Sequence, residues 1–368
     1  MRALVTGGGG FLGSGITNAL LNKGNEVSVM GRGRYPHLPA SIKILQGDIR
    51  DSEFVNASLK NIDTVFHTAA IPGIWGQDFF SINVQGTENI INTCQKNSVR
   101  KLIFTSSPSV VFDNASLEGV NESIPYPVKY LCDYPRTKAL AEKMVLQANT
   151  KNLSTVALRP HLIWGPGDPH LVPRLLEKAQ KNRLVQVGDG NNMVDILYID
   201  NAVSAHLLAC EALEGATNVA GKAYFISDGE PVVLWDWINQ LLGWMGRPNV
   251  SRKISYKNAM RLGGFLEGVY GLLGIKSEPP MTRFLASQLA TSHYFDISRA
   301  KKDFDYQSEH SKTARTSWNR LPGERSWIEI RNVFSNQPYL NVRPNTTIQY
   351  HARGGNHDPV EERAHNRE

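Results

Sequence analysis

Cysteine is scarce in this chain of 368 residues, and its scarcity excludes two classes of protein. The three cysteines, Cys94, Cys132 and Cys210, lie far apart and are odd in number. They form no Cys-x-x-Cys pair and no cluster with histidine, which is unlike a zinc site or a disulfide framework. We therefore predict no metal site, and free thiols in a reducing compartment.

Long hydrophobic runs and blocks of one charge are also absent from the sequence. No run of about 18 or more apolar residues occurs, so we expect no transmembrane helix. The chain opens on "MRALVTGG", which is typical of a strand, and we expect a cytoplasmic protein without a secretory signal. The net charge of +6 is spread without a basic block, which argues against a nucleic-acid partner.

Residues 259–275 are an exception, because they suggest contact with a membrane or a lipid-like molecule as one alternative. This segment is apolar and rich in glycine, with only Arg261 and Glu267 charged. It is too short and too interrupted to span a bilayer. It is either a buried helix or a lid over an apolar pocket, or else a segment that rests peripherally on a membrane or a lipid-like substrate.

The first residues of the chain carry the pattern of a dinucleotide site. "ALVT" is a short buried strand, and a helix follows it. The loop between them has glycines in a G-x-x-G-x-x-G spacing, which lets the backbone approach a pyrophosphate at the helix N-terminus. We expect the loop to bind a cofactor through Gly7, Gly10, Phe11, Leu12 and Gly13.

The end of the second strand bears on the choice between NAD and NADP. A site that prefers NAD usually has Asp or Glu there, to bind the 2′-hydroxyl of the ribose. This chain has Gly31 and Arg32, followed by Arg34. A guanidinium attracts a 2′-phosphate. The sequence therefore favours NADP(H), with a site that accepts both cofactors as the alternative.

Further strands alternate with helices along the chain, which predicts a doubly wound parallel (Rossmann) α/β sheet. Ligands bind beyond the carboxyl ends of such strands. We expect a third strand to end at Asp48 and Ile49, and a fourth to end at His67, Ala69 and Ala70. Ser107 lies at the end of a fifth, and Pro160 and Ile163 lie at a sixth.

The chain divides into three predicted parts. Residues 1–165 form the nucleotide-binding domain, and residues 166–307 form a smaller substrate-binding lobe with returns to the sheet. Residues 308–368 have few aliphatic side chains and no sustained period. We expect this tail to be a disordered extension or the product of a shifted reading frame, with partner binding as a further alternative.

Five motifs in order, "TGGGGFLG", "HTAA", "FTSSPSVVF", "YPRTK" and "RPHLIWGPGD", make the sequence resemble an extended short-chain dehydrogenase/reductase over about residues 1 to 307. Within that family it is similar to the 3β-hydroxysteroid dehydrogenase branch. This branch includes the sterol-4α-carboxylate 3-dehydrogenases (decarboxylating) and reductases of 2-alkyl-3-oxoalkanoates.

The resemblance implies roles for three residues. Tyr134 would be the general acid/base, Lys138 would hold the nicotinamide ribose and lower the pKa of Tyr134, and Ser107 would hydrogen-bond the substrate oxygen. Ser106 is a less favoured candidate for the last role. The i, i+4 spacing of Tyr134 and Lys138 suits this chemistry, because a nearby ammonium stabilises a phenolate.

Two more residues have alternative interpretations. Asn83 matches a position where the family keeps a helix-distorting or proton-relay asparagine, but a helix cap is an equal alternative. His161 follows the sixth strand, and we interpret it as a packed or pocket-lining residue rather than a catalyst.

The predicted substrate is a small apolar molecule. Sugar-nucleotide epimerases of the superfamily usually carry an arginine where this chain has residues 192–195, "NMVD", which argues against a nucleotide sugar. Bulky apolar residues in 235–244 line a pocket or form plain core. We expect a homodimeric NAD(P)-dependent oxidoreductase acting on a 3β-hydroxysteroid such as a sterol-4-carboxylate, with a 2-alkyl-3-oxoalkanoate reductase and a non-catalytic NADP(H) redox sensor as alternatives.

Overall fold

A seven-stranded parallel sheet forms the centre of the molecule. The computed structural model describes residues 1–71, 73, 75–215 and 218–309. The strand order is β12-β7-β5-β4-β1-β2-β3, and every neighbouring pair is parallel. The strands are β1 (Arg2–Thr6), β2 (Glu26–Gly31), β3 (Lys43–Gln46), β4 (Thr64–His67), β5 (Lys101–Thr105), β7 (Ser154–Pro160) and β12 (Lys222–Ile226). The predicted doubly wound sheet is confirmed.

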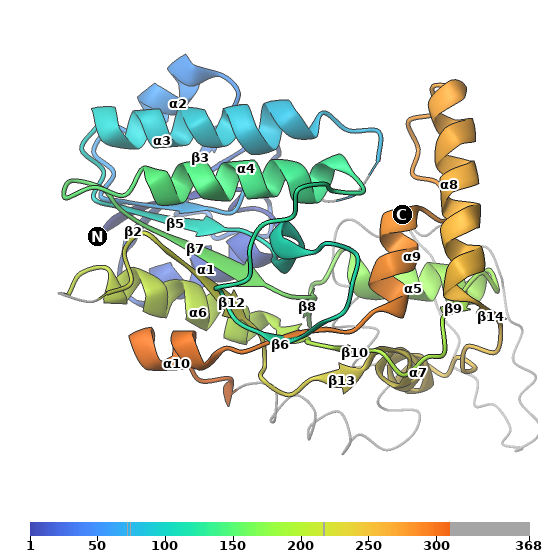
Figure 1. The fold of residues 1–368 in the computed structure, drawn as a ribbon. Helices are drawn as coiled ribbons and strands as arrows, with labels where there is room; N and C mark the ends of the chain where they lie inside the picture. The colour runs from blue at the N-terminus through green and yellow to red at the C-terminus, as the bar shows by residue number, and fades with distance from the viewer. Residues whose placement is uncertain (72, 74, 216–217, 310–368) are drawn as a thin grey trace, which may run out of the picture.

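Helices cover both faces of this sheet (Figure 1). On one face lie α2 (Ser52–Ser58), α3 (Gly86–Lys96) and α4 (Asp133–Gln147). On the other lie α1 (Phe11–Asn22), α6 (Ile199–Ala212) and α10 (Ser298–Phe304). Because successive side chains of a strand point to opposite faces, Leu4 packs in one core while Ala3 and Val5 pack in the other. Burial on both faces explains why the strands read as nearly continuous apolar runs.

A second, smaller set of elements packs beside the central sheet. Its segments alternate along the chain with the last strands of that sheet. It has a four-stranded sheet in the order β13-β10-β15-β6. Its strands are β6 (Leu117–Val120), β10 (Met193–Val194), β13 (Val232–Val233) and β15 (His293–Phe295). Two short parallel pairs add β8 (Ile163–Trp164) with β11 (Leu197–Tyr198), and β9 (Gln186–Val187) with β14 (Lys253–Ile254). The helices are α5 (Leu171–Gln180), α7 (Leu234–Trp244), α8 (Tyr256–Leu272) and α9 (Arg283–Ala290).

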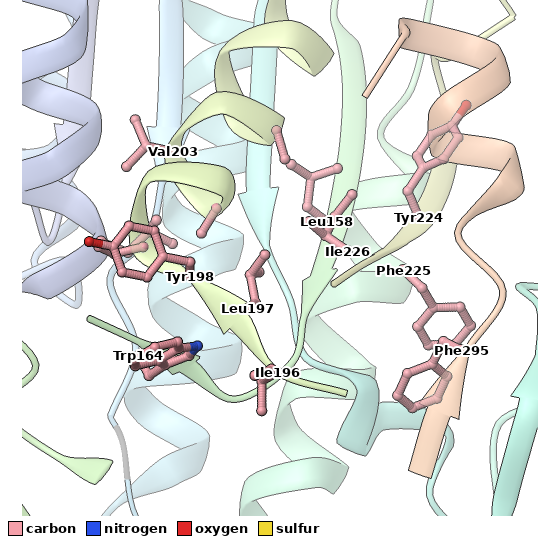
Figure 2. Packing of buried hydrophobic residues seen from close by; sticks show 14 of the residues in the cluster. Leu158, Trp164, Ile196, Leu197, Tyr198, Val203, Tyr224, Phe225, Ile226 and Phe295 are labelled. Atoms are coloured by element: carbon pink, nitrogen blue, oxygen red, sulfur yellow. The ribbon is translucent and has the colours of Figure 1, made fainter. Parts of the chain in front are cut away.

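Aromatic side chains join the two sets of elements. The rings of Phe225 in β12 and Phe295 in β15 stack with centroids 4.2 Å apart, and Figure 2 shows them face to face. Trp164 packs edge-on against Tyr198 at 5.5 Å. Trp235 of α7 is buried, which confirms that much of residues 235–244 is plain core. The domain boundary at residue 165 stays a prediction.

Two details differ from the sequence analysis. β3 ends at Gln46 rather than at Asp48 and Ile49, because the chain turns there and the backbone N–H of Asp51 donates to the carbonyl of Asp48 (3.1 Å). The buried-helix interpretation of residues 259–275 is wrong, because α8 buries only Ala259 and Gly263. Figure 1 shows α8 standing apart from the sheet, at the right of the view.

The described residues contain no helix that is long and apolar enough to cross a membrane. The predicted tail falls almost wholly on residues 310–368, which lie outside the described part of the chain.

Candidate active site

A cavity of about 510 Å³ lies beyond the carboxyl ends of the central strands. It gathers described residues from nine separate segments of the chain. Of the residues predicted to bind cofactor or substrate, those that line it are Gly7, Gly10, Phe11, Leu12, Gly13, Arg32, Asp48, Ile49, Ala69, Ala70, Ser107, Tyr134, Pro160 and Ile163. Lys138 is the one predicted residue that is not among the lining residues.

The glycine loop forms a tight cradle at one side of this cavity. Gly7 has φ +69°, and a Cβ there would lie 2.9 Å from the backbone nitrogen of Ala69. A Cβ at Gly13 would overlap the carbonyl oxygen of Gly7. The helix α1 begins directly after Gly10, with no side-chain cap and no acidic residue in its first turn. Its first N–H groups and its positive dipole are therefore available for a phosphate group.

A buried polar atom beside the cradle also points to a ligand. Ser106 is 5% exposed and lines the cavity. Its Oγ has no hydrogen-bond partner within the described part of the chain. Since buried polar groups are nearly always hydrogen-bonded, the serine hydroxyl and the glycine cradle together fit a bound dinucleotide.

Tyr134 and Ser107 meet on the lining of the same cavity. Ser107 caps the short 3₁₀ helix η2 (Pro108–Val111), and its Oγ lies 2.9 Å from Oγ of Ser109. Burial raises the pKa of Tyr134, and a side-chain hydrogen bond from Ser107 opposes that rise. The phenol is therefore protonated at neutral pH.

Lys138 lies one helical turn after Tyr134 on α4, but its environment differs from the prediction. It is 3% exposed, its Nζ donates to the carbonyl of Thr105 (2.6 Å), and it sits 4.1 Å from the ring centre of Phe104. Burial lowers the pKa of Lys138 to about 7, and the charge of Glu142 opposes the shift. Burial is the largest cause of the pKa shift of both groups, and the lowering of the Tyr134 pKa by Lys138 stays a prediction.

Asn83 lies inside a π-helical turn, η1 (Phe80–Gln85), that leads into α3. Its Oδ1 accepts from the backbone N–H of Ile71 (3.2 Å), and its Nδ2 donates to Oγ1 of Thr137 (3.2 Å). The helix-cap interpretation is therefore wrong. Asn83 ties the loop after β4 to the helix that carries Tyr134, and only the tertiary structure identifies Thr137 as its partner.

Charges are arranged in pairs where β2 and β3 end. The carboxylate of Asp48 is bound by Arg50, with Nε–Oδ1 at 3.0 Å and Nη2–Oδ2 at 2.7 Å. These hydrogen bonds hold the pKa of Asp48 below its usual range. Arg32 lines the same end of the cavity, as does Tyr35, which the sequence analysis did not select.

His161 is a packed residue, as expected. Its Nε2 lies 2.6 Å from Nδ1 of His293, whose Nε2 lies 2.9 Å from the carbonyl of Gln288. Because a carbonyl only accepts, His293 carries its proton on Nε2 and accepts from His161. His161 is not among the residues that line the cavity.

A second cavity of about 840 Å³ lies beside the first, between α8 and the loops that precede η1 and α4. Its lining includes the aromatic residues Trp75, Phe79, Tyr130 and Tyr270, three glycines of α8, and Arg136 and Arg283. The ring of Phe79 packs edge-on against Tyr134, with centroids 6.4 Å apart. One lining residue of the larger cavity thus contacts the residue predicted to be catalytic, and α8 borders this cavity as the lid interpretation expects.

Residues 192–195 have structural partners in place of the arginine of the epimerases. Nδ2 of Asn192 donates to the carbonyl of Thr291 (3.1 Å), and Oδ2 of Asp195 accepts from the backbone N–H of Phe295 (2.9 Å). Both contacts hold the second sheet together rather than facing the first cavity.

Solved structures with the same fold include nicotinamide-dependent enzymes. The chain is similar to UDP-glucuronic acid 4-epimerase from Bacillus cereus, solved with NAD, at 24% identity and a TM-score of 0.64, over 88% of this chain and 100% of the other. It is also similar to dTDP-glucose 4,6-dehydratase from Streptomyces venezuelae, solved with NAD, at 22% identity and a TM-score of 0.67, over 91% and 99%. These likenesses establish the fold.

Curated relatives are more similar in sequence. A 2-alkyl-3-oxoalkanoate reductase of Stenotrophomonas maltophilia is 46% identical over 83% of this chain and 94% of the relative. A second reductase of that name, from Shewanella oneidensis, is 45% identical over 83% and 82%. The human sterol-4-alpha-carboxylate 3-dehydrogenase, decarboxylating, is 35% identical over 83% and 84%.

These relatives make the chain an oxidoreductase of alcohol and keto groups that uses a nicotinamide cofactor. They give no support to the non-catalytic sensor alternative. The sequence pattern of one family matches residues 4–255. The chain therefore belongs to the 3-beta hydroxysteroid dehydrogenase/isomerase family.

Proposed function

We propose that this protein reduces the ketone of an apolar 3-oxo acid that carries a 2-alkyl branch. The observation that carries the proposal is Tyr134, which lines the first cavity beside Ser107 and packs against Phe79 of the second cavity. A phenol that keeps its proton at neutral pH is suited to give it to a carbonyl oxygen. The two relatives that bear the reductase name, at 46% and 45% identity, support the same direction of reaction.

Three residues of the chain have separate roles in the proposed reduction. The reduced nicotinamide supplies a hydride to the carbonyl carbon when it is bound. Tyr134 gives a proton to the carbonyl oxygen, so the ketone becomes a secondary alcohol. Ser107 hydrogen-bonds that oxygen as negative charge develops on it. Lys138 holds the nicotinamide ribose from the buried end of α4.

The cofactor is NADP(H) in this proposal. Arg32 lies at the cavity end where β2 stops, and the carboxylate of Asp48 is already bound by Arg50. A positive charge and the absence of a free carboxylate among the described lining residues both suit a 2′-phosphate. The glycine loop, Ile49, Ala69 and Ala70 hold the rest of the dinucleotide, and Pro160 and Ile163 lie against the nicotinamide.

The larger cavity receives the substrate. Its aromatic walls suit alkyl chains. Arg136 and Arg283 also lie on its lining, where Arg136 pairs with Asp133 (2.8 Å) and Arg283 with Glu267 (2.6 Å). Its glycines leave space, since a Cβ at Gly268 or Gly271 would meet nothing within 4 Å. Phe79 of its lining packs against Tyr134, with ring centroids 6.4 Å apart.

A second candidate is the oxidation of a 3β-hydroxysteroid that carries a 4-carboxylate, as a step of steroid metabolism. The family pattern and the sterol dehydrogenases at 34% to 35% identity favour it. The same residues then act in reverse, with Tyr134 taking the proton of the 3β-hydroxyl. The product is a β-keto acid, which loses carbon dioxide through its enol.

Absorbance of the reduced nicotinamide distinguishes the two candidates. The purified protein is mixed with NADPH or NADH and a 2-alkyl-3-oxo acid, and separately with NADP⁺ or NAD⁺ and a 3β-hydroxysteroid-4-carboxylate. We expect consumption of NADPH with the oxo acid. Production of reduced cofactor with the sterol acid alone would instead establish the second candidate.

Two proposals concern the surroundings of the enzyme. α8 exposes Phe265 (67%) and Leu272 (89%), and we propose that it touches a lipid surface or guides a lipid-like substrate to the second cavity. The homodimer expected from the sequence is also a proposal, which sedimentation velocity tests by the mass of the particle.

A further inference from the structure

Tyr35 occupies a seat built from three glycines at the adenosine end of the first cavity. A Cβ at Gly9 would overlap ring carbons of Tyr35, and a Cβ at Gly31 would overlap its hydroxyl oxygen. At Gly33 a Cβ would lie 3.0 Å from the ring. The ring therefore bridges the glycine loop and the end of β2, and glycine at Gly9 and Gly31 is what lets it lie there.

The hydroxyl of Tyr35 has a free proton. The backbone N–H of Gly33 donates to the phenol oxygen at 3.2 Å. The oxygen is thus an acceptor in that bond, and its own hydrogen is left to donate to another group. Among the described residues no group accepts a hydrogen bond from it, and the hydroxyl lies at the end of β2 on the cavity lining.

The position of this hydroxyl suggests which group of the cofactor accepts its hydrogen bond. In dinucleotide-binding folds the end of the second strand faces the adenosine ribose, where a carboxylate accepts from the 2′-hydroxyl. Here the only acid on the lining of the described cavity is Asp48, and Arg50 binds both of its oxygens. In place of a free carboxylate, the uncharged phenol of Tyr35 lies near the end of β2, and Arg32 also lies on the lining there.

We propose that Tyr35 is a specificity-determining residue that recognises the 2′-phosphate of the cofactor by donating a hydrogen bond to it. The proposal rests on the proposed use of NADP(H) and extends it to a residue outside the sequence motifs. A hydrogen bond from a neutral donor to a phosphate is charge-assisted and stronger than one to a hydroxyl. Arg32 supplies a positive charge for the phosphate. Tyr35 supplies a hydrogen-bond donor at a fixed position, because the three glycines hold its ring in place.

The experiment separates the hydroxyl from the ring. Tyr35→Phe keeps the ring against Gly9 and removes only the donor. Dissociation constants of NADPH and NADH are measured by titration of reduced-nicotinamide fluorescence, which needs no substrate and no turnover. We expect the NADPH constant of Tyr35→Phe to rise roughly tenfold, as for a lost hydrogen bond to a charged group. The NADH constant should change by less than about twofold, since its ribose hydroxyl gains little from this donor.

The matched control is Tyr294→Phe, which removes a phenol oxygen from β15, outside both described cavities. It should leave both dissociation constants unchanged. Tyr35→Asp places the carboxylate of an NAD site at this position and should reverse the preference toward NADH.

Two results would overturn the role of Tyr35. One is an unchanged NADPH constant in Tyr35→Phe, and the other is an equal loss of affinity for both cofactors, which would assign Tyr35 a packing role alone. Failure of the proposed cofactor is distinguishable, because the wild-type protein would then bind NADPH no more tightly than NADH.

Discussion

At the scale of single residues, the pKa of Tyr134 decides the chemistry. The sequence pairs Tyr134 with Lys138 by helical spacing, which predicts a phenol with a lowered pKa. The structure buries both groups, which raises the pKa of the tyrosine and lowers that of the lysine to about 7. Spacing along a helix fixes which residues are neighbours, whereas desolvation depends on everything packed around them.

The residue-scale prediction concerns Tyr134→Phe, which removes the proton donor and keeps the ring against Phe79. We expect kcat to fall by about 10²–10⁴-fold, the usual contribution of a general acid. The dissociation constant of the cofactor should stay within about twofold, because Tyr134 contributes no phosphate contact. Turnover and fluorescence titration measure the two effects.

Tyr294→Phe is again the control and should keep full turnover. Near-normal turnover in Tyr134→Phe would show that another group donates the proton.

At the scale of elements, α8 is the part whose role was hardest to predict. Its composition suggested burial, but the helix exposes several large apolar side chains: Leu262, Phe265, Leu272 and, just after its end, Leu273. Its glycine-bearing side borders the second cavity. Hydropathy shows how apolar a helix is, whereas the packing of α9 against it decides which side is covered.

The element-scale prediction is that Phe265→Ser together with Leu272→Ser weakens binding to phospholipid vesicles. These side chains are exposed, so the substitutions remove apolar contact area without opening a cavity in the core. Co-sedimentation with vesicles measures the bound fraction, and thermal unfolding shows whether the fold is kept.

Val128→Ser, which changes an exposed apolar residue away from α8, is the matched control. Equal vesicle binding by the wild type and the double variant would rule out a membrane role for α8.

At the scale of the whole molecule, buried histidines link stability to pH. Burial lowers the pKa of His67 to about 3 and of His206 to about 4, and it also lowers the pKa values of His161 and His293. Burial acts in the opposite sense on Asp195, whose pKa it raises to about 7. Burial also raises the pKa of Glu122, so four histidines with lowered pKa values stand against two carboxyl groups with raised ones.

The whole-molecule prediction is that the free energy of unfolding falls as the pH drops from about 6.5 toward 5. In that window the unfolded chain, with histidines of pKa near 6.5, binds protons that the native protein does not. Asp195 opposes the trend, because its native form holds a proton that the unfolded form has lost. Urea unfolding at a series of pH values measures the slope.

His206→Gln should reduce that slope by about one proton, whereas the surface variant His37→Gln should leave it unchanged. An identical slope in His206→Gln would mean that His206 is not neutral in the native protein.

The sequence alone determined the sheet and most of the site. The sequence shows three local patterns directly: the glycine spacing after a buried strand, the small residues at strand ends, and the spacing of Tyr134 and Lys138. Such patterns can be recognised without knowing the tertiary contacts. Fourteen of the predicted site residues line one cavity, because parallel strands bring their carboxyl ends to the same edge.

Only the tertiary structure decided the rest. The partner of Asn83, the seat of Tyr35, the pairing of Asp48 with Arg50 and the exposed face of α8 all depend on groups brought together by packing. No periodicity in the sequence specifies which side chain fills the space above a glycine or how far an ionisable group is removed from water. Those contacts set the pKa values and the cofactor end of the cavity, and with them the chemistry that we propose.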